Sequence, residues 1–145
     1  MKTKTTIISL EHDDLVNLLS TAVYGSQWLS IRKRKADYYG TELENENDCA
    51  EDTWAKVLLS GKAVFAYDYY AEDADEHYGK LPYRYNGECM RYTLTLDDIV
   101  KGLQNALDNG DYMAECVMGL INEDIDLTIA ENLMQWIIFG ELVYG

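Results

Sequence analysis

The chain has 145 residues and a formal charge of −14, because 26 acidic residues stand against only 12 basic ones. Apolar residues make up 48%, which excludes a largely disordered chain, and the length suits one domain over 1–145 with a substantial core. No apolar run reaches the roughly 18 residues of a membrane span, and the acidic run directly after Leu10 does not fit a signal peptide. We therefore expect a cytoplasmic protein that does not bind membranes.

Cysteine and histidine usage argues against disulfides and metals. Cys49, Cys89 and Cys116 are odd in number and widely spaced, which predicts free thiols in a reducing compartment. His12 and His77 stand apart, and no pair of ligands has the spacing of a zinc site. We expect no metal and no cofactor.

The first predicted elements are a short extended segment and a helix. Residues 3–9 are rich in β-branched side chains, which favours a strand or an extended arm. Ser9 is the expected N-cap of a helix over 10–24, because acidic residues follow it and apolar residues recur at helical spacing until Gly25. A short second helix is expected around 54–59.

Two strands are predicted in the middle of the chain, over 62–70 and 88–96. The segment between them is polar, contains Pro82 and two glycines, and is expected to form a long loop. We therefore expect the two strands to pair as a hairpin with an extended tip. Three aromatic residues alternate along the first strand and would share one face: Phe65, Tyr67 and Tyr69.

The segment after the second strand is predicted to be helical. Thr95 followed by Asp98 is close to the capping-box pattern, so a helix is expected to begin after Thr95. Gly110 would end this helix. Residues 111–125 are expected to hold one or two further helical turns.

The last predicted helix is capped by Asp126 or Thr128 and ends at Gly140, with a short strand or tail over 141–145. No repeat or low-complexity linker divides the chain. These elements predict an α+β fold: a single domain with a small antiparallel sheet packed with about three main helices.

Acidic residues gather in the C-terminal third, where residues 97–145 hold ten of them and a single lysine, Lys101. Such a surface repels a nucleic-acid backbone, so direct nucleic-acid binding is not expected. Solubility is the simplest interpretation of the charge. The alternative is that carboxylates over 97–131, or in the acidic loop 42–52, mimic phosphates and bind a basic protein.

No catalytic motif stands out, because the chain lacks a Gly-rich phosphate loop and nothing places a cysteine beside a histidine. Basic and aromatic residues instead alternate around 28–39 and 83–92. Guanidinium groups hold phosphates and aromatic rings stack on bases, so this pattern indicates a pocket for a small anionic nucleotide. Sheet packing and pairing with acidic residues are the alternative interpretation. The expected stacking residues are Trp28 and Tyr83, and the expected phosphate ligands are Arg32, Arg34, Arg84 and Arg91.

Three segments resemble known proteins: LLSTAVYGSQW over 18–28, TLTLDDIVKGLQNAL over 93–107 and IDLTIAENLMQWIIFGELVYG over 125–145. They resemble small uncharacterised proteins of phages, prophages and conjugative elements of gut bacteria. Those proteins share a tail of the form F-G-E-[IV]-V-[FY]-G, which here reads FGELVYG. Residues 29–92 depart from the pattern, and no functional residue is carried over.

The resemblance implies an accessory protein of a mobile element, and such proteins often antagonise host anti-phage defence. Some, such as the anti-Thoeris proteins, are non-enzymatic oligomers that sequester cyclic nucleotide or ADP-ribose signals. Others are acidic mimics that inhibit nucleases, as anti-CRISPR and anti-restriction proteins do. We expect the first mode, with self-association and no catalysis, and keep the second as the alternative.

Overall fold

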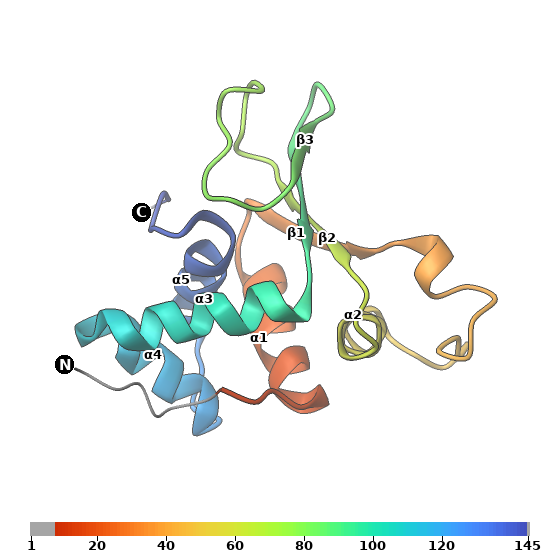
Figure 1. The fold of residues 1–145 in the computed structure, drawn as a ribbon, viewed down its shortest axis with the longest axis horizontal. Coiled ribbons are helices and arrows are strands. Elements are labelled where there is room, and N and C mark those ends of the chain that lie inside the picture. Colours follow the sequence, from red (N-terminus) through yellow and green to blue (C-terminus); the bar gives the residue numbers. More distant parts are fainter. Residues whose placement is uncertain (1–7, 145) are drawn as a thin grey trace.

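A computed structural model describes residues 8–144 (Figure 1). The α+β class and the small antiparallel sheet are confirmed, and α1, α3 and α5 are the longest of five α-helices in the described range. In chain order the elements are α1 (His12–Gly25), β1 (Leu29–Lys33), a 3-10 turn η1 (Lys35–Asp37), α2 (Ala50–Leu59), β2 (Val64–Asp68), β3 (Tyr83–Tyr85), β4 (Met90–Leu94), α3 (Leu96–Asn109), α4 (Asp111–Ile121) and α5 (Leu127–Phe139).

The four strands form one antiparallel sheet in the order β1-β2-β4-β3. The predicted hairpin is confirmed, because β2 pairs with β4 from Val64 opposite Leu94 to Asp68 opposite Met90. Two strands were not predicted: β1, and β3 inside the segment expected to be loop. β3 has three residues and pairs only with β4, so it is too short to show alternation in the sequence.

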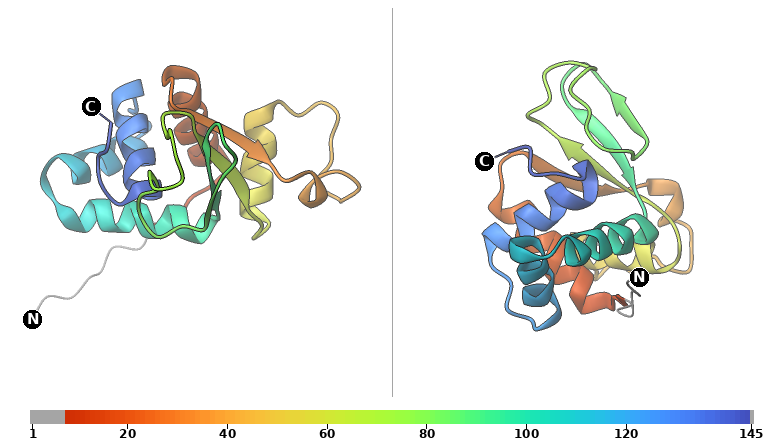
Figure 2. Two further views of the ribbon diagram at one scale, coloured as in Figure 1. Left: turned by 90° about the horizontal axis from the view of Figure 1, so that it is seen from above. Right: turned by 60° about the vertical axis from the view of Figure 1, so that its left-hand side comes forward.

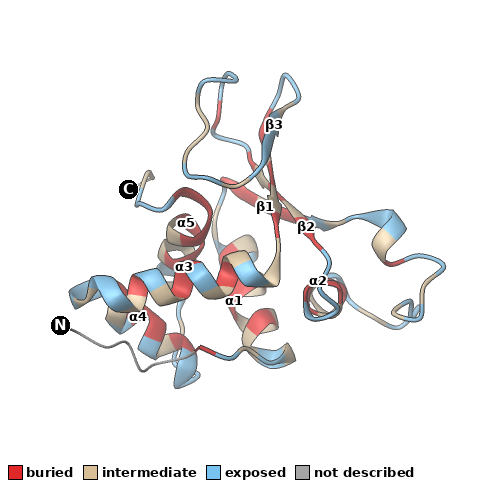
Figure 3. Ribbon diagram, in the orientation of Figure 1, coloured by how far each residue is buried: buried red, intermediate tan, exposed pale blue. Residues whose placement is uncertain are grey.

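One face of the sheet, the inner face, is buried. Val64, Ala66 and Tyr92 have no exposed surface there, and α1 and α2 pack against β1. Figure 3 shows buried residues where the strands and helices meet. Each large apolar side chain removed from water contributes about 1.5–3 kcal/mol, so this face supplies much of the stability.

The β3 end of the sheet and the loop over 69–82 project beyond the helices, as Figures 1 and 2 both show. Two hydrogen bonds fasten this loop to the sheet. The Tyr78 backbone N–H donates to the Tyr92 hydroxyl at 3.1 Å, and the Tyr85 hydroxyl donates to the Glu72 carbonyl at 2.7 Å. The loop is therefore anchored to the sheet and not to the helices at these points.

Two predicted helix caps are confirmed. Thr95 and Asp98 form a reciprocal capping box, since the Asp98 N–H donates to the Thr95 hydroxyl at 3.2 Å and the Thr95 N–H donates to the Asp98 carboxylate at 3.0 Å. Asp126, and not Thr128, caps α5 by accepting from the Ile129 N–H at 2.8 Å.

The predicted cap at Ser9 is wrong. The N-cap of α1 is Glu11, whose backbone N–H donates to the Asp14 carboxylate at 2.8 Å. An acidic residue three positions on satisfies this N–H, so the helix begins two residues later than expected. Most of the predicted strand or arm over 3–9 lies outside the described residues.

The segment after α3 holds more helix than the one or two turns predicted. Gly110, with φ of 76°, closes α3 and immediately precedes α4, which runs for 11 residues. Gly110 and Asp111, both at positive φ, thus turn the chain between two helices without a loop. The buried residues of α4 are Met113, Cys116, Val117 and Leu120.

The C-terminal tail is clamped onto α5 and β2. Buried Gln135 accepts from the N–H groups of Val143 and Tyr144 at 2.8 and 2.7 Å and donates to the Tyr144 carbonyl at 3.0 Å. The Tyr144 hydroxyl donates to the carboxylate of buried Asp68 at 2.6 Å. Burial raises the pKa of Asp68, against the lowering effect of this hydrogen bond.

Candidate functional site

The face of the sheet opposite the buried one is basic and aromatic. Side chains alternate along strands, so residues opposite one another in the register share a face. Arg32 of β1 lies opposite Phe65 of β2, while Arg91 of β4 lies opposite both Tyr67 of β2 and Arg84 of β3. We call the following set the outer sheet face: Ser30, Arg32, Phe65, Tyr67, Arg84, Arg91 and Thr93.

Phe65 lies at the centre of this face, with two guanidinium groups beside its ring. The Cζ atom of Arg91 is 4.2 Å from the ring centroid and that of Arg34, just beyond β1, is 5.8 Å away. Cation–π contacts of this kind contribute about 0.5–1 kcal/mol at exposed sites. Both guanidinium groups are therefore held within about 10 Å of each other by one aromatic ring.

The aromatic ring of Phe65 begins a row along β2. The Tyr67 ring is 6.4 Å from Phe65 at an interplanar angle of 77°, and the Tyr69 ring stacks on Tyr67 at 6.3 Å and 16°. Tyr69 is 47% exposed, so part of its ring is accessible to a ligand. The row supplies flat apolar surface beside the arginines.

A hollow of about 360 Å³ opens at the β3–β4 end of this face. Arg84 and Arg91, directly opposite each other in the register, both line it. The Nε atom of Arg91 is buried and has no hydrogen-bond acceptor among residues 8–144. An unmade hydrogen bond of a buried donor costs about 1–3 kcal/mol. The other lining residues are Tyr67, Tyr85 and Asn86.

Most of these arginines lack a carboxylate partner. Within the described part of the chain, no ion pair involves Arg32, Arg84 or Arg91, and Arg34 contacts Asp37 through its Nε at 3.4 Å. The chain carries 26 acidic residues, so unpaired arginines gathered on one face are unexpected. The outer sheet face is therefore a region of positive electrostatic potential on an acidic protein.

The structure brings together the four arginines expected to hold phosphates, with Arg32, Arg84 and Arg91 on the outer sheet face and Arg34 at its rim. Tyr83 shares its face with inner residue Tyr92 and stacks on His77, with ring centroids 3.9 Å apart. It therefore lies on the wrong side of the sheet to act with these arginines.

The predicted stacking role of Trp28 is wrong. Trp28 is 1% exposed, and its ring contacts Phe139 and Tyr144 at 5.3 and 5.4 Å. Its Nε1 donates to a Glu131 carboxylate oxygen at 3.2 Å. Trp28 is a core residue with its polar atom satisfied, which leaves no ring face for a ligand.

The sequence interpretation missed the aromatic half of the site. Alternation predicts that Phe65, Tyr67 and Tyr69 share one face, but alternating aromatic residues are equally typical of ordinary sheet packing. What brings them into the candidate site is the register of β2 with β4, which places Arg91 opposite Tyr67. Register between strands 20 or more residues apart is a tertiary property that alternation alone does not determine.

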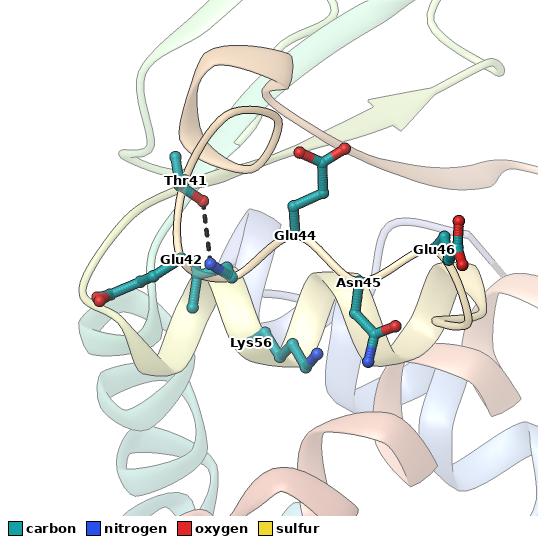
Figure 4. A pocket seen from close by; sticks show the side chains of 7 residues that line it. Thr41, Glu42, Glu44, Asn45, Glu46 and Lys56 are labelled. Carbon is teal, nitrogen blue, oxygen red and sulfur yellow. Dashed lines mark hydrogen bonds between the residues drawn. The ribbon is translucent and has the colours of Figure 1, made fainter.

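Another hollow, of about 570 Å³, lies between the acidic loop and α2 (Figure 4). It is lined by the loop's own side chains and Lys56, and the loop is braced by a hydrogen bond from the Leu43 N–H to the Thr41 hydroxyl at 3.2 Å. Lys56 forms an ion pair with Asp48, with its Nζ 2.8 Å from the carboxylate, and this contact lowers the pKa of Asp48. Carboxylates at its rim make this hollow unsuited to an anion.

The remaining chemistry of the described residues is sparse. The three cysteines are free thiols, as predicted. Over residues 8–144, no group of three or more His, Cys, Asp or Glu side chains is arranged to hold a metal ion, and no helix has the length and apolar character to cross a membrane. Comparison with protein-family models, curated proteins and solved structures finds no match to this chain.

Proposed function

We propose that the protein binds a small anionic nucleotide on the outer sheet face and acts by this binding, without a chemical step. The observation that carries the proposal is the group of arginines that form no ion pair with residues 8–144, beside an accessible aromatic row in a chain of charge −14. Arg84 directly opposite Arg91 places two like charges together at an energetic cost, which a bound anion would remove.

Nucleotide chemistry matches both halves of the face. Guanidinium groups hold phosphates through paired, charge-assisted hydrogen bonds, and base stacking on aromatic rings contributes about 1–3 kcal/mol per base. The strong negative charge elsewhere on the chain disfavours a long polyanion such as DNA or RNA. A small ligand that fits wholly within the positive field avoids this repulsion.

Sequestration of a signalling nucleotide is the biological role that we propose, on the resemblance to proteins of mobile elements. The protein would act in the cytoplasm of a bacterial host as an antagonist of anti-phage defence. Self-association remains a prediction from the tyrosine-rich composition. Light scattering of the purified protein measures it directly, and a monomer at all accessible concentrations contradicts it.

A titration of the purified protein with cyclic dinucleotides and with ADP-ribose tests the proposal. Calorimetry and thermal shift should both detect binding, and Arg84→Gln should weaken it at least tenfold, since Arg84 lines the hollow. Lys62→Gln is the matched control, because it removes one exposed positive charge that lies off the outer sheet face. No binding of any of these ligands by the wild-type protein contradicts the proposal.

A second candidate is the acidic mimic that inhibits a nuclease. It is favoured by seven exposed carboxylates along α3, α4 and the start of α5: Asp97, Asp108, Asp111, Glu115, Glu123, Asp124 and Asp126. Reversing the charge of several of them should abolish inhibition of a target nuclease and reduce the salt dependence of the complex. Inhibition that survives the reversal excludes this candidate.

A further inference from the structure

Resting on the proposed function, we infer that the ligand carries two phosphate groups, which are held by two separate arginine positions around Phe65. The first position is formed by Arg84 and Arg91 and the second by Arg34, with Arg32 beside it. The two-phosphate class includes nucleoside diphosphate derivatives such as ADP-ribose and cyclic dinucleotides with two phosphodiesters.

The first position is the hollow of about 360 Å³ at the β3–β4 end. Directly opposite residues in an antiparallel pair have Cα atoms roughly 4.5–5.5 Å apart, so the side chains of Arg84 and Arg91 begin close together. One phosphate between them would relieve their repulsion and offer an acceptor to the unpartnered Nε of Arg91.

The second position comes from the other edge of the sheet. Arg34 follows β1, and β1 is separated from β4 by β2, so their backbones lie about 9–10 Å apart at the usual strand spacing. Arg34 nevertheless reaches to 5.8 Å from the Phe65 ring. Its contact with Asp37 is through Nε at 3.4 Å, on the inner side of the guanidinium group.

The distribution of positive charge over two positions favours two phosphates over one. Four arginines contribute to the site and Asp37 offsets one of them, which leaves about three positive charges to be balanced. A single phosphate at the first position would leave the remaining positive charge of Arg34 and Arg32, which Asp37 offsets in part, without a counter-charge at the second. A second phosphate within reach of Arg34 balances both positions at once.

Calorimetric titrations with AMP, ADP-ribose and cyclic di-AMP, at one salt concentration, test the inference. We expect ADP-ribose or cyclic di-AMP to bind at least tenfold more tightly than AMP, and the tighter of these two identifies the kind of phosphate linkage. If AMP binds as tightly as both, the two-phosphate inference is overturned while the proposed function stands. If none of the three binds, both are overturned.

Two variants locate the second position. Arg34 is exposed, so Arg34→Gln should fold normally. We expect this variant to bind the two-phosphate ligand about tenfold more weakly and to bind AMP with unchanged affinity. Lys35→Gln removes the neighbouring charge of the same run and should change neither affinity by more than twofold. An equal loss of AMP and two-phosphate affinity in Arg34→Gln, or no loss of either, contradicts the assignment of Arg34.

Discussion

Replacing Arg84 by threonine should stabilise the free protein while weakening the proposed nucleotide binding at least tenfold. Arg84 is exposed on the edge strand β3 and lies directly opposite Arg91. Like charges at opposite positions destabilise a sheet by about 0.2–1 kcal/mol, and threonine is a better strand residue at an exposed position. We expect a gain of about 0.5–1 kcal/mol, which for a chain of this size raises Tm by about 2 °C.

Arg32→Thr is the matched control for this experiment. Arg32 is also exposed on an edge strand of the same face, but it lies opposite Phe65 and not another arginine. Both variants lose one positive charge, so the general effect of net charge cancels in the comparison. In thermal melts at low salt, the Tm of Arg84→Thr should be higher than that of Arg32→Thr. This difference in Tm should shrink near 1 M salt, where the screening length is about 3 Å. Equal Tm values at low salt would refute the reasoning.

Two further predictions concern stability. Tyr144→Phe removes a hydrogen bond to buried Asp68 and should cost about 1–3 kcal/mol at pH 7 in urea unfolding. Burial raises the pKa of Asp68 above 3.8, so this group favours folding more as the pH falls through the raised pKa and the carboxylate becomes protonated. The free-energy cost of Tyr144→Phe should therefore shrink in this pH range. A cost that does not change with pH contradicts the reasoning. Gly102→Ala should destabilise by about 1–2 kcal/mol despite its better helix propensity, since its Cβ would lie 2.8 Å from the Ile137 Cα. Asn105→Ala, an exposed position in α3, is the control and should be neutral or slightly stabilising; a stabilised Gly102→Ala shows that α3 and α5 separate easily.

Local rules predicted much of the fold. Thr95 and Asp98 are three residues apart, so their capping box depends only on nearby chain, and the same holds for the glycines at positive φ that end α3 and α5. The β2–β4 hairpin was recognisable because both strands are five residues long and rich in strand-forming side chains. By contrast, β3 has no such local signature.

The site could be predicted only in part. The pattern of arginines beside aromatic residues selected basic residues that the fold gathers on one face, yet the same rule selected Trp28, which is buried between α5 and the tail. Whether an aromatic side chain faces solvent or the core depends on what packs over it, and for Trp28 that is Phe139 and Tyr144, more than 100 residues away. Phe65 joins the candidate site only through the pairing of β2 with its neighbours.

The anchoring of the tail has a practical consequence for anyone handling this protein. Asp68 sits between Tyr67 and Tyr69 in β2 and its turn, so the bond from Tyr144 secures the strand directly behind the aromatic row. A chain shortened before Val143 would remove the hydrogen bonds that Val143 and Tyr144 make to Gln135 and Asp68. Strand β2 would then be less firmly held on its inner face. Affinity tags and fusions are therefore better attached at the opposite terminus, since a disturbed tail would be mistaken for a defect in the proposed binding face.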